Sequence, residues 1–536
     1  MKGFSNGLKW TTAAVLFVSM TAAPAFAAKT TPATDKKTDV PAVPRAIPDL
    51  IPYHKFDPPT SKMFDINNLN ITGDIRVRPE FRNNTAFGTG GSIAVGANPS
   101  STSQNNDFFV QQWVRLGFHY TISPDVVFFF QPQYSKNWGD ASPAAGAGDP
   151  NASNGEGNDI FARQAFMLIR NFGVKNLTAK IGRQLVVWGN HRMFGHFDWN
   201  NVGWAFDGAS LHYTVNPNIS VETAWLRVRE GECAGSGAGS CTGSAVTTGG
   251  GVPTGSGTAG DANIIFVRAP MKFAGVVLEP TWIWHDSGTG GALSGARPSN
   301  QSRHTIGGRV TTTQAISKVR VDVTGEGYYQ FGEIGAPGLA RLQDIEAYAL
   351  HFDGGITLPV PMQPRIGGEF NIASGSSDAN SCSTGTGTVA NGGCNSDWRG
   401  FDQLFPTNHI HFGYMDRMAW KNMIHFAAGL QLRPTADSHL EITGHKFYLN
   451  ETNDNWYQAT QTVYITSPAG NQEDDLGSEI DVVYTMFFTP GNHVAWQIGG
   501  GVFFPGDFID DNPQSGFNNV GVGNESWGYT QLWINW

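Results

Sequence analysis

Apolar and polar residues alternate along most of the chain from residue 69 onward. In the stretch LNITGDIRVRPEFR, residues 69–82, apolar side chains such as Leu69, Ile71 and Val77 are separated by polar or charged ones. Because successive side chains on a β-strand point to opposite faces, a period of two predicts a strand with one apolar and one charged face. Helical periodicity is scarce, so the pattern as a whole predicts an all-β protein.

The same pattern predicts about eighteen strands, an even number of the kind found in bacterial outer-membrane barrels. Many of the runs of alternation are separated by Pro, Asn, Asp or Gly, which favour turns. The expected strands lie near residues 69–82, 107–121, 125–136, 160–171, 176–188, 204–214, 218–230, 262–271, 274–286, 303–314, 317–330, 340–354, 362–373, 421–433, 437–450, 478–488, 493–505 and 525–536.

The connections between these strands alternate between short and long. Short connections include ISPD at 122–125 and VNPN at 215–218, whereas long ones include 231–260 and 374–420. Soluble β-sandwiches also contain alternating strands, but a sandwich has no reason to place its short and long loops on opposite sides. The sequence therefore predicts a closed antiparallel transmembrane β-barrel with short periplasmic turns and long extracellular loops.

The two ends of the chain support export to the bacterial outer membrane. Residues 1–27 have the basic start, short apolar run and Ala-Phe-Ala cleavage pattern of a signal peptide. Residues 28–66 are expected to form a Pro-rich periplasmic lead-in, followed by the barrel over 67–536. The last strand ends in Trp536 with apolar residues at alternate positions before it, which is similar to the terminal signal read by outer-membrane assembly machinery. Both termini are expected in the periplasm.

Composition narrows the functional classes. The 536 residues include 66 Gly, 35 Phe and 16 Trp and carry a formal net charge of −10. No run of about 18 apolar residues is present, so no spanning helix is expected, and the acidic balance argues against a nucleic-acid partner. The chain lacks the Gly-x-Ser-x-Gly motif of hydrolases and the Cys-x-x-Cys-His motif of haem attachment. We therefore expect no enzymatic activity and no cofactor.

Four cysteines fall in two close pairs, Cys233 with Cys241 and Cys382 with Cys394, each in a stretch rich in Gly, Ser and Asn. In an oxidising compartment each pair can close a small disulfide loop, which is the interpretation that we favour. Metal binding is the alternative, but no histidine stands at zinc-finger spacing beside either pair.

In such a barrel, alternation sorts side chains between lipid and lumen. A charge on the lipid face costs about 2–4 kcal/mol near the bilayer midplane, so charged strand residues are expected to face inward. Arg183 breaks register with Lys180, which a bulge or a position at the outer rim would explain. Arginine can hold a carboxylate through two parallel hydrogen bonds, so the lumen is either a salt-bridged wall or a conduit for anions. The expected pore-lining residues are Arg76, Arg78, Glu80, Arg82, Arg115, Lys180, Arg309, Arg320, Asp322, Glu326, Arg365 and Glu369.

The stretch GNHRMFGHFDWNN, residues 189–201, combines charged and large apolar side chains in one short segment. His191, His196 and Asp198 are candidate metal ligands by residue type. Their spacing is irregular for a strand or helix site, and no other cluster supports a metal. We therefore expect these residues to pack a loop or line the pore mouth, in an extracellular connection between the fifth and sixth strands.

Several separated motifs resemble the alginate export family of outer-membrane barrels. The matching stretches are Arg163-Gln164-Ala165, Gly182-Arg183-Gln184, Asp198-Trp199, Phe206-Asp207-Gly208 and the segment FDQLFPTNHIHFGYMD at 401–416. The resemblance implies an eighteen-stranded monomeric channel with an arginine-rich pore that exports an anionic polysaccharide. A fold does not fix its cargo, and the near-equal number of acidic and basic lumen residues is a poor match to a dedicated polyanion pore.

The leading hypothesis is thus a passive outer-membrane channel that conducts an anionic saccharide or a similar solute through a charged lumen. One alternative is a substrate-selective porin for small solutes, which would be favoured if the long loops fold into the lumen. A non-conducting barrel with a structural or adhesive role is another. The expected partners are outer-membrane lipid, a saccharide or small solute, and the assembly machinery.

Overall fold

The computed structural model describes residues 64–66, 68–84, 106–138, 160–229, 262–287, 300–335, 343–377, 397–467, 471–488, 493–510 and 523–536. The expected signal peptide, nearly all of the lead-in and all four cysteines lie outside these ranges. Within these ranges, no helix has both the length and the apolar character needed to cross a membrane.

Eighteen long strands form one antiparallel sheet, which confirms the strand number and fold class predicted from the alternation. The short strands β1 (Phe64–Ile66) and β10 (Met271–Phe273) pair at its margin. The long strands are β2 (Leu69–Asn83), β3 (Asn106–Ser123), β4 (Val126–Asn137), β5 (Phe161–Ile169), β6 (Leu177–Gln184), β7 (Phe206–Asn216), β8 (Ile219–Arg229), β9 (Ala262–Arg268), β11 (Val276–Ser287), β12 (Asn300–Ile316), β13 (Val319–Gly335), β14 (Gln343–Thr357), β15 (Arg365–Ala373), β16 (Met423–Leu432), β17 (Ser438–Tyr448), β20 (Asp475–Phe487), β21 (Val494–Pro505) and β22 (Glu525–Asn535).

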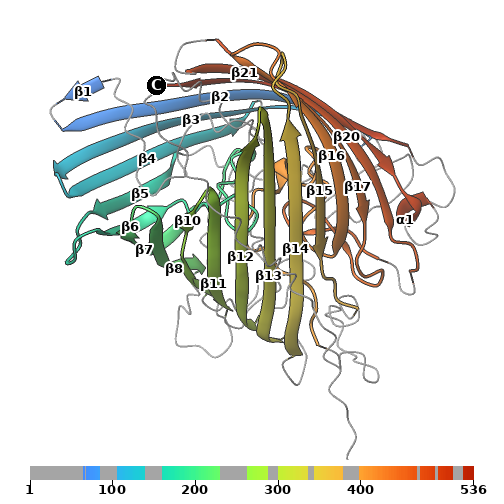
Figure 1. The fold of residues 1–536 in the computed structure, drawn as a ribbon, viewed down its shortest axis with the longest axis horizontal. Helices are drawn as coiled ribbons and strands as arrows, with labels where there is room; N and C mark the ends of the chain where they lie inside the picture. Colours follow the sequence, from blue (N-terminus) through green and yellow to red (C-terminus); the bar gives the residue numbers. More distant parts are fainter. Residues whose placement is uncertain are drawn as a thin grey trace, which may run out of the picture. The chain divides into compact units, whose positions relative to one another are not determined.

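The sheet closes because β2 pairs with both β3 and β22. Val77, for example, lies opposite Gln112 on β3 and opposite Leu532 on β22. Every other long strand pairs with its neighbours in chain order, so the C-terminal strands return beside β2 (Figure 1). Closure satisfies the backbone hydrogen bonds of all strands, which is the condition for a sheet to exist in lipid.

Short and long connections separate at the two ends of the strands, as predicted. Two-residue turns such as 124–125, 217–218 and 317–318 lie at one end, which we call the short-turn end. The long connections, including 185–205 and the chain between β15 and β16, leave from the opposite, long-loop end. Ser317 adopts a positive φ of 59°, as a tight turn between twisted strands requires.

The two faces of the strands differ sharply in exposure. Along β14, buried and exposed residues alternate almost without interruption, so that Leu350 is 51% exposed whereas its neighbour His351 is 3% exposed. Phe352 on the same strand, Ile366 on β15 and Ile480 on β20 are likewise exposed. The outward face is therefore an apolar belt suited to lipid, and the inward face carries the polar residues.

Arg183 lies on the outward face, where a bulge or a rim position was expected to explain it. The pairing of β6 with β7 has no register shift, so a bulge is not the cause. Arg183 instead forms an ion pair with Asp207 across the strands, at 2.9 Å, close to the long-loop end. The strand expected at 176–188 ends earlier, at Gln184, because the chain there turns away from the sheet.

The hydrophobic core lies inside the barrel, in three inner segments: residues 185–205, 397–422 and 449–467. Phe194, Phe405 and Trp420 of these segments are buried against inward residues of the sheet. The segments also contact one another, since Phe194 bridges to Phe405 and the Trp456 indole donates to the Arg417 carbonyl. They contain the 3-10 turn η1 (Asn408–Ile410) and the short strands β18 (Trp456–Tyr457) and β19 (Val463–Ile465), while the short helix α1 (Asp507–Asp510) follows β21.

A barrel of this strand number can enclose a water-filled channel. Here the inner segments occupy much of that interior on the long-loop side, with apolar side chains packed together and polar ones directed at the wall. The free space that remains in the lumen on that side therefore depends on how these segments are held.

Substitution on the outward face tests the position of the membrane belt. Leu350→Arg, at the centre of β14, should lower the free energy of unfolding by about 2–4 kcal/mol, because the charge meets the middle of the lipid. Ile316→Arg is the matched control, since Ile316 is 64% exposed at the turn end of β12 and should cost about 0–1 kcal/mol. Denaturant titration in lipid vesicles measures both, and equal losses would contradict this belt.

Candidate functional site

The twelve residues predicted to line the pore all lie on strands and share the face that points away from lipid. Eight of them are buried, and the other four are partly exposed. Eleven of the twelve residues form two groups on different parts of the wall. Lys180 on β6 belongs to neither group, and its ammonium lies 4.3 Å from the centre of the Phe166 ring. The first group is Arg76, Arg78, Glu80, Arg82 and Arg115 on β2 and β3; the second is Arg309, Arg320, Asp322, Glu326, Arg365 and Glu369 on β12, β13 and β15.

Arginines of the first group bind backbone carbonyls of the inner segments. Arg76 donates to the Asp198 carbonyl at 2.6 Å and Arg78 to the Trp199 carbonyl at 2.6 Å. Arg82 donates to the Met415 carbonyl at 3.1 Å and also pairs with Glu80. These guanidinium groups are at most 1% exposed, so they hold the inner segments against the wall instead of facing open water.

The Asp198 carboxylate is the centre of this contact. Both terminal nitrogens of Arg115 donate to it, at 2.9 and 3.0 Å, and Arg163 of β5 donates at 2.8 Å. Burial alone would raise the pKa of Asp198, but the adjacent charges of Arg115 and Arg163 outweigh burial and hold the pKa well below its usual range. Asp198 is therefore ionised, and its charge compensates guanidinium groups from two strands.

Aromatic rings fix the guanidinium planes of this cluster. The Arg76 and Arg115 guanidinium carbons lie 3.5 and 3.7 Å from the centre of the Trp113 ring. Arg78 lies 3.6 Å above the Trp199 ring, which stacks in turn on the His409 imidazole. Arginine retains its charge while stacked, so these contacts orient the donors without neutralising them.

The second inner segment, residues 397–422, is anchored to strands on the far side of the β2–β22 pairing that closes the barrel. Arg417 forms a two-point ion pair with Glu525 of β22, with both groups buried. Burial lowers the pKa of Arg417, but the Glu525 carboxylate more than offsets it and raises the pKa above the usual value. The backbone N–H groups of Tyr414 and Met415 donate to Asp481 and Glu479 of β20.

A chain of buried polar side chains crosses five adjacent strands, from β14 to β20. Its first four members are hydrogen-bonded in sequence at 2.8, 2.8 and 2.9 Å, and the last two lie 3.6 Å apart. His425 and His445 are both buried on the inward face of their strands, but alternation alone gives no sign that they are bonded to each other. In order along the wall, the members are His351, Asn371, His425, His445 and Asp481.

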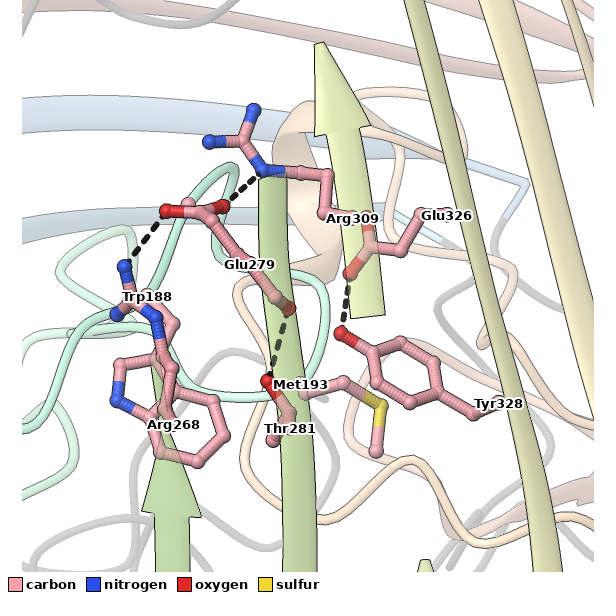
Figure 2. A pocket seen from close by; sticks show the side chains of 9 residues that line it. Trp188, Met193, Arg268, Glu279, Thr281, Arg309, Glu326 and Tyr328 are labelled. Carbon is pink, nitrogen blue, oxygen red and sulfur yellow. Dashed lines mark hydrogen bonds and ion pairs between the residues drawn. The ribbon is translucent and has the colours of Figure 1, made fainter. Parts of the chain in front are cut away.

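A small pocket lies where residues 188–193 of the first inner segment meet the second group of charges. Glu279 binds Arg268 and Arg309, each at 2.6 Å, and the Tyr328 hydroxyl donates to Glu326 (Figure 2). Trp188, Gly189, Met193 and Thr281 complete its lining. Arg268 and Glu279 were not among the predicted residues, although the inward face of the strands could have indicated them.

Gly189 is required where it stands. Its φ is +46°, and a Cβ atom there would lie 2.6 Å from Nε of Arg309. Only glycine permits the backbone to approach the charged wall so closely.

His191, His196 and Asp198 are parts of a packed segment inside the barrel. The two histidine rings meet edge to face with centroids 4.8 Å apart, and the Asp198 backbone N–H donates to the His196 ring. No group of His, Cys, Asp and Glu suited to a metal occurs within the described ranges. The segment does connect the fifth and sixth barrel strands, as predicted, and it enters the lumen from the long-loop end.

Two of three comparisons with known proteins found matches, and both point to outer-membrane β-barrels. Residues 264–523 match the profile of the family described as alginate export, whereas none of the curated proteins matches the chain. The structure of Acinetobacter baumannii OccAB1 is similar with a TM-score of 0.54 and 13% identity, over 88% of this chain and 97% of that one. Identity at this level shows a common fold alone.

Two Pseudomonas aeruginosa barrels have the same fold at a TM-score of 0.50. OccK2 (OpdF), solved in complex with glucuronate, is 10% identical over 88% of this chain and 98% of its own. The outer membrane protein OprD is 11% identical over 88% of this chain and 94% of its own.

The Arg417–Glu525 pair should dominate the docking of residues 412–420. Arg417→Ala leaves the buried Glu525 carboxylate without its main partner, which should weaken local protection from hydrogen exchange by about 3 kcal/mol. The control is Arg399→Ala, because Arg399 meets Glu346 at 3.9 Å with both side chains more than half exposed; it should cost below about 1 kcal/mol. An unchanged exchange rate in Arg417→Ala would contradict the anchoring role.

The lowered pKa of Asp198 predicts how the docking of residues 185–205 against the wall depends on pH. A carboxyl with a lowered folded-state pKa contributes stability above its unfolded pKa of about 3.9, and that stability is lost as pH falls through the folded pKa. Residues 185–205 should therefore stay docked from pH 7 down to about 4. Limited proteolysis across this range measures docking, and cleavage that begins near pH 6 would show that another group controls it.

Proposed function

We propose that this β-barrel, which resembles the alginate export family over residues 264–523, is an outer-membrane channel that passes small carboxylate-bearing solutes and not an intact polysaccharide. The observation that carries the proposal is the filling of the interior by residues 185–205, 397–422 and 449–467. A polymer needs a continuous wide path, whereas a small solute needs only local gaps along a charged wall. Inward folding of the long loops is what a small-solute porin requires.

The charges of the wall support an anionic solute. On the wall, Arg309 donates to Glu279 of the neighbouring strand β11, and Arg365 donates to Asp322 of β13. Arginine offers a planar fork that fits a carboxylate, and nearby acids keep each site weak. Weak sites that repeat along a path allow passage, whereas one tight site would trap the solute.

A second candidate is an anionic polysaccharide conduit, which is favoured by the family match and by the arginines of β2 and β3. It requires the inner segments to leave the lumen during transport. Arg76, Arg78 and Arg82 would then exchange backbone carbonyls for polymer carboxylates. The two candidates therefore differ in the largest solute that the resting channel admits.

Solute flux into proteoliposomes separates the candidates. Glucuronate is the probe, because a barrel of the same fold was solved with it; glucose is the neutral control of the same ring size, and a uronate hexamer represents the polymer. We expect glucuronate to enter faster than glucose and the hexamer to be excluded. Rapid entry of the hexamer would favour the polysaccharide conduit, and entry of none of them would indicate a non-conducting barrel.

A further inference from the structure

We infer that the arginines around Asp198 form a carboxylate-binding site that the protein's own side chain occupies at rest, and that a solute carboxylate enters it by displacing Asp198. The inference rests on the proposed function and specifies its ligand-binding site. It assigns to Asp198 the role of an internal ligand whose release moves residues 185–205.

The contacts of Asp198 are those of a bound ligand. Arg115 donates through both terminal nitrogens to the two carboxylate oxygens, and Arg163 adds a third bond at 2.8 Å. The donors lie on the barrel strands β3 and β5, whereas the acceptor belongs to an inner segment. A solute carboxylate presents the same two oxygens, so it can satisfy the same fork.

The central donor of the site is held independently of the inner segment. The Arg115 Nε donates to Gln133 of β4 at 2.7 Å, and its guanidinium stacks on Trp113 of the same strand. Arg76 stacks on the same ring. Departure of Asp198 therefore leaves at least two guanidinium groups oriented by the wall, ready for another anion.

Because the arginine cluster is buried and positively charged, the Asp198 carboxylate can leave only when another anion takes its place. Arg76, Arg115 and Arg163 are each 1% exposed, and the buried Asp74 of β2, opposite Arg115, offsets one of their three charges. Removing the Asp198 carboxylate without a replacement therefore leaves buried positive charge in excess, which is strongly unfavourable. A neutral solute cannot provide that compensation, but a carboxylate can. The Asp198 side chain is 10% exposed, so an incoming anion can approach the site from that exposed side.

The neighbouring bonds indicate the class of solute. Arg76 also donates to the Asp198 carbonyl, and Arg163 donates to the carbonyls of His196 and Trp204. When the segment moves, these donors need uncharged oxygen acceptors next to the carboxylate. A hydroxylated monocarboxylate, such as a sugar acid, supplies both kinds of oxygen in one molecule.

The first test is Asp198→Asn, with the flux and the concentration dependence of glucuronate block measured in planar bilayers. The amide keeps the size of the side chain but cannot accept both arms of the Arg115 fork, so glucuronate should half-saturate at a roughly tenfold lower concentration. The methyl ester of glucuronate, which lacks the charge, should bind equally weakly to the wild type and to Asp198→Asn. Asp207→Asn is the matched control, because Asp207 pairs with Arg183 on the outward face. Unchanged half-saturation in Asp198→Asn would overturn the inference.

A second measurement needs no substitution and so does not depend on the folding of a variant. Glucuronate should accelerate hydrogen exchange of residues 196–204 in the wild-type protein, whereas glucose and the methyl ester should not. Exchange that stays unchanged while glucuronate crosses the membrane would overturn the displacement and leave the proposed function intact. Failure of glucuronate to cross at all would instead contradict the proposed function.

Discussion

The pairing of charge inside the barrel is the constraint on which the rest of the structure depends. Strands that cross lipid must turn their charged residues inward, and charged residues buried in the lumen must find partners there. The wall alone meets part of this need, as in the pairs of Glu80 with Arg82 and of Arg365 with Asp322. The inner segments meet much of the rest, because they bring Asp198, Arg192 and Arg417 to wall residues of opposite charge. The segments are therefore electrostatically complementary to the wall, as well as packed by their aromatic residues.

This complementarity links the fold to transport. A segment held by ion pairs and by carbonyl acceptors can be released when a solute supplies the same chemistry, whereas a segment held only by apolar packing has no reason to respond to an anion. The Trp113 ring belongs to the wall and orients Arg76 and Arg115, so these donors keep their geometry around whichever oxygen atoms are present. In the proposed displacement, selectivity and gating arise from one set of residues.

Much of the fold could be predicted from the sequence because a period of two is a local signal. Alternation located the eighteen strands, and the cost of charge in lipid placed residues such as Arg76 and Glu326 on the inward face. The contacts that define the site could not be predicted in the same way. Arg82 meets Met415 across 333 positions of the chain, and Arg115 meets Asp198 across 83. The segment 189–201 was conspicuous for its mixture of charged and aromatic residues, but only the closed sheet shows that Asp198 points at Arg115 and Arg163.

Replacement of residues 185–205 by a two-residue Asn-Gly turn tests the central claim that this segment controls the width of the lumen. Gln184 and Phe206 lie opposite each other on β6 and β7, so such a turn can join them without disturbing the sheet. Single-channel conductance of the shortened protein, compared with the wild type in the same salt, is the measurement. We expect a several-fold larger conductance and entry of the uronate hexamer. Conductance and size limit equal to those of the wild type would show that the segment does not restrict the channel.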